Sequence, residues 1–73
     1  MNKNAASDRE RAIDTLQHLF DYARSEQRIA IQQSQAAREV KDFRVMDRHA
    51  SYANAMQKIH QRINRLAREL YLH

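Results

Sequence analysis

The 73-residue sequence contains neither glycine nor proline. Glycine supplies the left-handed backbone of tight turns and phosphate-binding loops, and proline interrupts helices, so this chain lacks the usual residues for all three features. Ala, Arg and Gln are the most frequent residues, and they favour helices, as Leu and Glu also do. The sequence therefore predicts an all-α protein.

Two segments carry apolar residues at alternating spacings of three and four, the pattern of one helix face. The stripe of the first segment comprises Ile13, Leu16, Phe20, Ala23, Gln27 and either Ala30 or Ile31. The stripe of the second segment comprises Tyr52, Met56, Ile59, Ile63, Leu66 and Leu70. Both stripes predict amphipathic helices of about 30 residues, roughly 45 Å long at 1.5 Å per residue.

Charged residues separate the two stripes. The segment REVKDFRVMD, residues 38–47, breaks the pattern, and the stripes do not continue on one helix face. We therefore expect a short turn here, with Asp42, or next Asp47, as the N-cap of the second helix. The predicted fold is an antiparallel two-helix hairpin, and a single uninterrupted helix is the alternative.

The start of the first helix is indicated by the segment SDRE, residues 7–10. It fits a capping box, in which the Ser7 hydroxyl and the Glu10 carboxylate each accept a hydrogen bond from the other residue's backbone. The preceding MNKNAA has no helical period. We expect residues 1–6 to be a disordered tail and residues 7–73 to form a single helical-hairpin domain.

The first helix has a second apolar series outside its stripe. This series predicts a dimer or partner interface made by Leu19, Tyr22, Ile29, Val40 and Phe43. A hairpin has almost no interior, and without cysteine it cannot be stapled by disulfides, so two copies would complete a four-helix bundle. The alternative is that these residues are scattered exposed side chains, and the relative direction of the two copies stays open.

Residues for catalysis and cofactors are not arranged in recognisable motifs. The His residues lack the paired spacing of helical metal sites, and the Ser residues have no neighbouring base or glycine-built turn. The sequence therefore predicts a non-enzyme with no metal site and no cofactor. Apolar runs of two or three residues predict no membrane span, and we expect a cytoplasmic protein.

The net charge of +4 arises from 13 Lys and Arg against nine Asp and Glu. A basic flank of the second helix, formed by Arg44, Lys58, Arg62 and Arg65, could contact nucleic acid or an acidic protein surface. Asp47 and Glu69 fall on the same flank, without aromatic residues for base stacking. The alternative is a solvated face whose Arg stems cover the apolar stripe.

The sequence therefore favours a small interaction protein that acts stoichiometrically on a larger protein partner, as an adaptor or inhibitor. Inhibitors of host machinery encoded by phages or mobile elements act in this way, and the chain has a size typical of them. The alternative function is a nucleic-acid-binding hairpin dimer that uses the Arg-rich flank. Salt would distinguish them, because binding to phosphates weakens steeply as salt rises.

Overall fold

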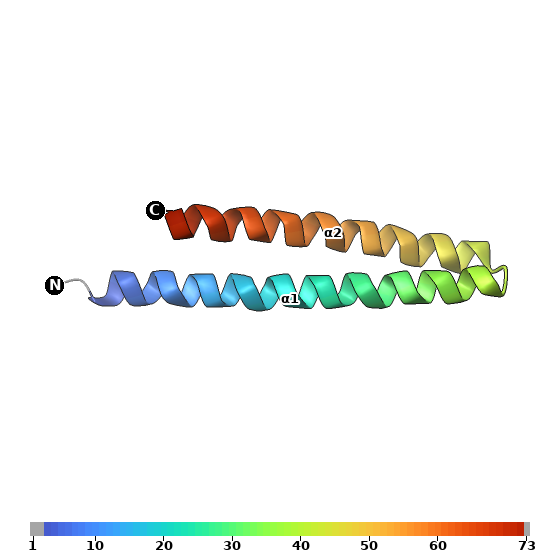
Figure 1. Cartoon of the computed structure of the whole chain (residues 1–73), viewed down its shortest axis with the longest axis horizontal. Coiled ribbons are helices and arrows are strands. Elements are labelled where there is room, and N and C mark those ends of the chain that lie inside the picture. Colours follow the sequence, from blue (N-terminus) through green and yellow to red (C-terminus); the bar gives the residue numbers. More distant parts are fainter. Residues whose placement is uncertain (1–2, 73) are drawn as a thin grey trace.

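The computed structural model describes residues 3 to 72, and the side chains of residues 8 to 72. Helix α1 spans Lys3–Glu39 and helix α2 spans Phe43–Leu72. The two helices lie side by side in opposite directions (Figure 1), and the rod measures 62 × 14 × 12 Å between Cα atoms. The predicted all-α hairpin is confirmed, and the alternative of one uninterrupted helix is wrong.

The turn uses Lys41 where helix ends commonly use glycine. Lys41 has a φ of 61°, its backbone N–H donates to the Arg38 carbonyl at 3.0 Å, and the Asp42 N–H donates to the Ala37 carbonyl at 2.9 Å. This pair of bonds is the Schellman arrangement, which satisfies carbonyls that the end of a helix leaves unpaired. The chain thus reverses in three residues without glycine.

Asp42 also begins the second helix, as the sequence predicted. Its Oδ1 accepts a hydrogen bond from the Val45 backbone N–H at 3.3 Å, and its carbonyl accepts the N–H of Met46 at 2.9 Å. These are the two bonds of an N-cap residue. One residue therefore completes the end of α1 and caps the start of α2.

Helix α1 begins at Lys3, four residues before the expected cap at Ser7. The residues from Lys3 to Ala6, which the sequence assigned to a disordered tail, are helical. Met1 and Asn2 lie outside the described residues, and so does the Ser7 side chain on which the capping box depends. Good helix formers such as Ala5 and Ala6 give a physical reason for the earlier start.

A seam of buried and half-buried side chains joins the helices with the repeating three-four spacing of a coiled coil. In α1 the seam comprises Ile13, Leu16, Phe20, Ala23, Gln27, Ala30, Ser34 and Ala37. In α2 it comprises Met46, His49, Ala53, Met56, His60, Ile63, Ala67 and Leu70. The stripe predicted for α1 is confirmed, with Ala30 buried and Ile31 41% exposed.

The stripe predicted for α2 is half wrong. Tyr52, Ile59 and Leu66 remain 43%, 44% and 43% exposed, and Ala53, His60 and Ala67 face α1 instead. The only buried apolar side chains among those described are Ala23, Ala30, Ala37 and Ala53. Small side chains let two helices approach closely, so packing selected the alanine edge of α2 rather than its larger apolar residues.

Three polar residues within the seam, Gln27, Ser34 and His60, form hydrogen bonds across it. His60 Nε2 donates to Gln27 Oε1 at 2.7 Å, and the His60 ring meets Phe20 edge-on, with ring centroids 5.3 Å apart. Nearer the turn, the Ser34 hydroxyl donates to the Met46 carbonyl at 3.0 Å. A polar pair in an apolar seam disfavours other registers, because sliding one helix would leave its hydrogen-bonding groups unpaired.

Candidate interaction surface

An apolar face on α1 lies beside the seam and is open to solvent. Leu19, Tyr22, Ile29 and Val40 are 48%, 62%, 44% and 75% exposed. Leu19 and Val40 are separated by a multiple of seven residues, and so are Tyr22 and Ile29, so each pair shares one position of the seven-residue repeat. Helical periodicity puts both positions on the same side of the seam. Four of the five predicted interface residues therefore share a face.

The fifth predicted interface residue, Phe43, is placed differently. It is the first residue of α2 and is 57% exposed, so it does not continue the face of α1, which ends at Glu39. The chain reverses between Val40 and Phe43. The helical spacing that placed Phe43 on the same face as Val40 therefore does not apply across the turn. Phe43 lies at the turn end of the rod.

Helix α2 extends the apolar face with residues that the sequence assigned to the buried stripe. Tyr52, Ile59 and Leu66 repeat every seven residues along one edge of α2. When each helix is viewed from its own N-terminus, this edge of α2 and the apolar edge of α1 lie on the same rotational side of the seam. In an antiparallel pair of helices, two such edges meet on the same side of the hairpin. We define the apolar face by its exposed residues on both helices: Leu19, Tyr22, Ile29, Val40, Tyr52, Ile59 and Leu66.

One observation places the contributions of α1 and α2 on the same side. A shallow groove near the turn is lined by Ala36 of α1, by the turn residue Val40, and by Val45 and His49 of α2. The apolar face is thus continuous across the hairpin.

Tyr22 is held in its neutral form on this face. Its pKa is raised above the usual 10.0, first by a hydrogen bond to the Glu26 carboxylate and then by the negative charge of that carboxylate. Slight desolvation and Tyr52 act in the same direction. A tyrosine phenol is an uncharged donor at neutral pH in any case, and this shift extends its neutral form to higher pH; such a group suits a contact surface that is apolar with a polar edge.

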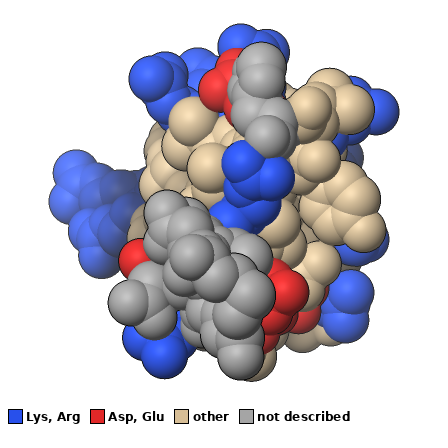
Figure 2. Space-filling model, turned by 90° about the vertical axis from the view of Figure 1, so that its left-hand side faces the viewer, with Lys and Arg blue, Asp and Glu red and all other residues tan. Residues whose placement is uncertain are grey.

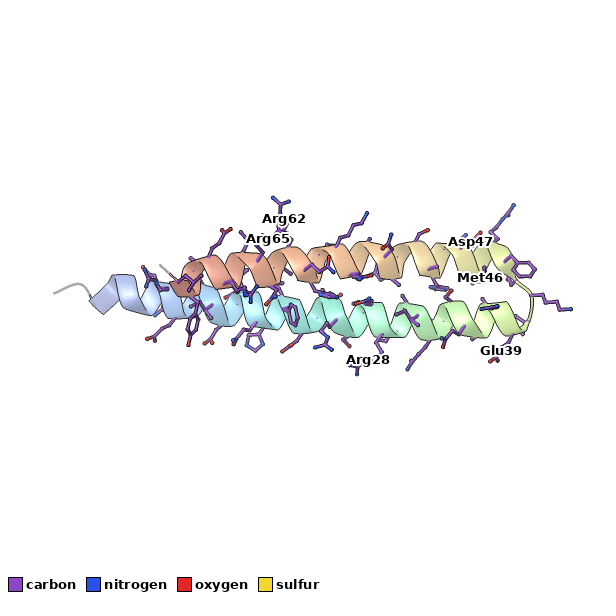
Figure 3. The ribbon with its side chains drawn as sticks, turned by 45° about the horizontal axis from the view of Figure 1, so that its top comes forward. Arg28, Glu39, Met46, Asp47, Arg62 and Arg65 are labelled. Atoms are coloured by element: carbon purple, nitrogen blue, oxygen red, sulfur yellow. The ribbon has the colours of Figure 1, made fainter. Side chains whose placement is uncertain are left out.

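The predicted basic flank forms the outer surface of α2. Arg44, Lys58, Arg62 and Arg65 are all exposed, and Arg62 and Arg65 point away from α1 (Figure 3). Arg28 and Glu39 point away from α2 on the other side of the rod (Figure 3). We call Arg44, Lys58, Arg62 and Arg65 the basic face. It is separate from the seam.

The two helices differ in net charge. Helix α1 contains six Lys or Arg and six Asp or Glu, so its net charge is zero. Helix α2 contains six Lys or Arg and two Asp or Glu, so its net charge is +4, the charge of the whole chain. Seen from the end where the termini lie, Lys and Arg side chains project from several sides (Figure 2).

The edge of the apolar face shows a smaller difference. Arg48 and Arg62, fourteen residues apart on α2, are exposed beside Tyr52, Ile59 and Leu66, and Glu69 lies seven residues after Arg62 on the same edge. The α1 side of the face includes Glu26, which is half-buried, and the uncharged residues Ala36 and Gln33. The apolar face is therefore bordered by two cations and one carboxylate along α2 and by neutral or acidic groups along α1.

Among the described residues, no group of three His, Asp or Glu side chains is placed to hold a metal ion. In the same part of the chain, neither helix has a stretch apolar and long enough to cross a membrane. No family model, curated protein or solved structure matches this chain.

Proposed function

We propose that this chain is a non-catalytic interaction protein that acts stoichiometrically on a larger protein partner, as an adaptor or inhibitor, and that it works as a homodimer. The observation that supports this proposal is the continuous apolar face across both helices. Exposed apolar side chains scattered singly are normal, but a contiguous patch marks a contact surface. Its aromatic members, Tyr22 and Tyr52, belong to a residue type that often anchors interfaces.

The exposed area supports a second copy as the occupant of this face. The chain exposes 6237 Å², whereas a compact protein of its mass, 8.7 kDa, exposes about 4,700 Å². A stable interface buries about 800 Å² on each partner, roughly half of this difference. Two hairpins packed through their apolar faces would form a four-helix bundle, which has the interior that one hairpin lacks.

The basic face supplies the surface for the larger partner. It points away from the seam, and of its four residues only Arg62 borders the apolar face that the two copies would share. Arg side chains bind carboxylates through two parallel hydrogen bonds, so an acidic protein surface fits this face. A dimer would present two such faces.

A second candidate function is nucleic-acid binding through the same basic face. The observation that favours it is the concentration of the entire net charge on α2. Contacts from Lys and Arg to phosphates need no base recognition, and they would make binding strongly dependent on salt.

The test of the dimer compares the parent with Tyr22→Ala by sedimentation equilibrium at micromolar concentration. Removing an aromatic anchor should weaken self-association on the order of tenfold. Tyr71→Ala is the matched control, since Tyr71 is 78% exposed and lies outside the apolar face. A monomeric parent, or equal weakening by both variants, would contradict the proposed interface.

The test of the partner begins with the protein that co-purifies in a fixed ratio with the unmodified chain from the cells that produce this chain. The complex is then reconstituted from the two purified proteins. Changing Arg62 and Arg65 together to Gln should weaken this complex, whereas Arg28→Gln with Arg38→Gln on α1 removes the same charge and should not. A duplex DNA is titrated in parallel. Strong duplex binding by the parent, with a slope of log affinity against log salt that falls by about 1.8 in the Arg62, Arg65 variant, would instead support the nucleic-acid function.

A further inference from the structure

We infer that the two copies pack with their turns at the same end of the bundle, so that α1 of each copy lies against α2 of the other. The inference rests on the homodimer proposed above and concerns its arrangement. The observation that carries it is the unequal net charge of the two helices, zero for α1 and +4 for α2.

Symmetry limits the choice to two arrangements. Two copies related by a two-fold axis use the same patch on both sides. If two hairpins stack face to face with their turns at the same end, α1 of one copy covers α2 of the other. If their turns lie at opposite ends, α1 covers α1 and α2 covers α2.

Charge distinguishes these arrangements. With turns at opposite ends, the two α2 helices, each of net charge +4, are neighbours. With turns at the same end, each α2 helix instead meets α1, whose net charge is zero. Juxtaposed like charges select against an arrangement, so the arrangement with turns at the same end is favoured.

The apolar side chains also fit this arrangement. His60 contacts both Phe20 and Gln27, so the neighbouring Ile59 lies at a height between these two residues of α1. With turns at the same end, Ile59 of the second copy would therefore fall between Tyr22 and Ile29. Leu66 and Tyr52 lie seven residues to either side of Ile59 in α2. Leu66 of the second copy would therefore approach Leu19, and Tyr52 of the second copy would lie just beyond Ile29. Side chains of the two faces would then alternate rather than collide.

The absence of cysteine from the sequence makes a direct distance measurement possible. Glu39→Cys near the turn and Asp14→Cys near the open end place single spin labels at exposed positions on α1. The two positions are 25 residues apart in the sequence, about 37 Å along the helix. Pulsed electron paramagnetic resonance is recorded on each labelled dimer and on a mixture of the two labelled chains.

With turns at the same end, the distance between two Glu39 labels should be shorter than the distance from a Glu39 label to an Asp14 label on the other copy. The reverse order in a protein that is dimeric by light scattering would overturn the arrangement and leave the homodimer in place. A monomeric mass at all concentrations would overturn both.

Discussion

At the scale of single residues, Lys41 and Asp42 carry the reversal of the chain. A non-glycine residue with a φ of 61° costs roughly 1 to 2 kcal/mol, because its Cβ is too close to the backbone. Two backbone hydrogen bonds to the end of α1 and the Asp42 cap on α2 offset this strain. The turn is therefore held by its neighbours, despite the conformational preference of Lys41.

Lys41→Gly should raise the free energy of unfolding by about 0.5 to 1 kcal/mol. Glycine removes the strain but adds freedom to the unfolded chain, so the gain is smaller than the strain itself. Thermal unfolding checks this, with an expected rise in Tm of about 2 to 8 °C for a chain of this size. Lys41→Ala keeps the Cβ and should show no rise, and a Gly variant that melts below the parent would contradict a strained turn.

At the scale of the helices, periodicity predicted the fold and most of the α1 seam, because apolar residues and small residues coincide on that face. In α2 they diverge. Ile59 and Ala53 lie on adjacent edges, and hydrophobicity alone points to the edge with the larger residues. Which edge faces α1 depends on how closely the helices approach, and that distance cannot be read from one helix. The α2 half of the apolar face was missed for this reason.

Two substitutions of the same kind separate these edges. Ile63→Ala should lower the free energy of unfolding by about 2 kcal/mol, because Ile63 lies in the seam and its truncation leaves a cavity. Ile59 is 44% exposed in one hairpin, so Ile59→Ala should have a small effect at low protein concentration and a growing effect as the parent dimerises. Denaturant unfolding at two protein concentrations measures both. If both variants lost the same free energy of unfolding at low protein concentration, Ile59 would have to pack in the seam, which would contradict this assignment.

At the scale of the whole molecule, the chain is a rod with very little interior. Its Cα radius of gyration is 16.9 Å, against about 11 Å for a compact chain of this length. The seam provides close contact at its buried alanines, its larger apolar residues are only half-buried, and several other large apolar side chains are exposed. A second rod would supply the missing layer, which is why stability and self-association are expected to change together.

The three-residue turn also sets the order in which the hairpin forms. The Ser34 to Met46 hydrogen bond closes a separation of 12 residues, and the Gln27 to His60 bond closes one of 33. Closing the longer loop first would cost about 0.9 kcal/mol more in chain entropy. We therefore expect the helices to close from the turn outward, with Ser34→Ala slowing folding and Gln27→Ala mainly speeding unfolding in temperature-jump kinetics. The reverse assignment would place the folding nucleus at the open end.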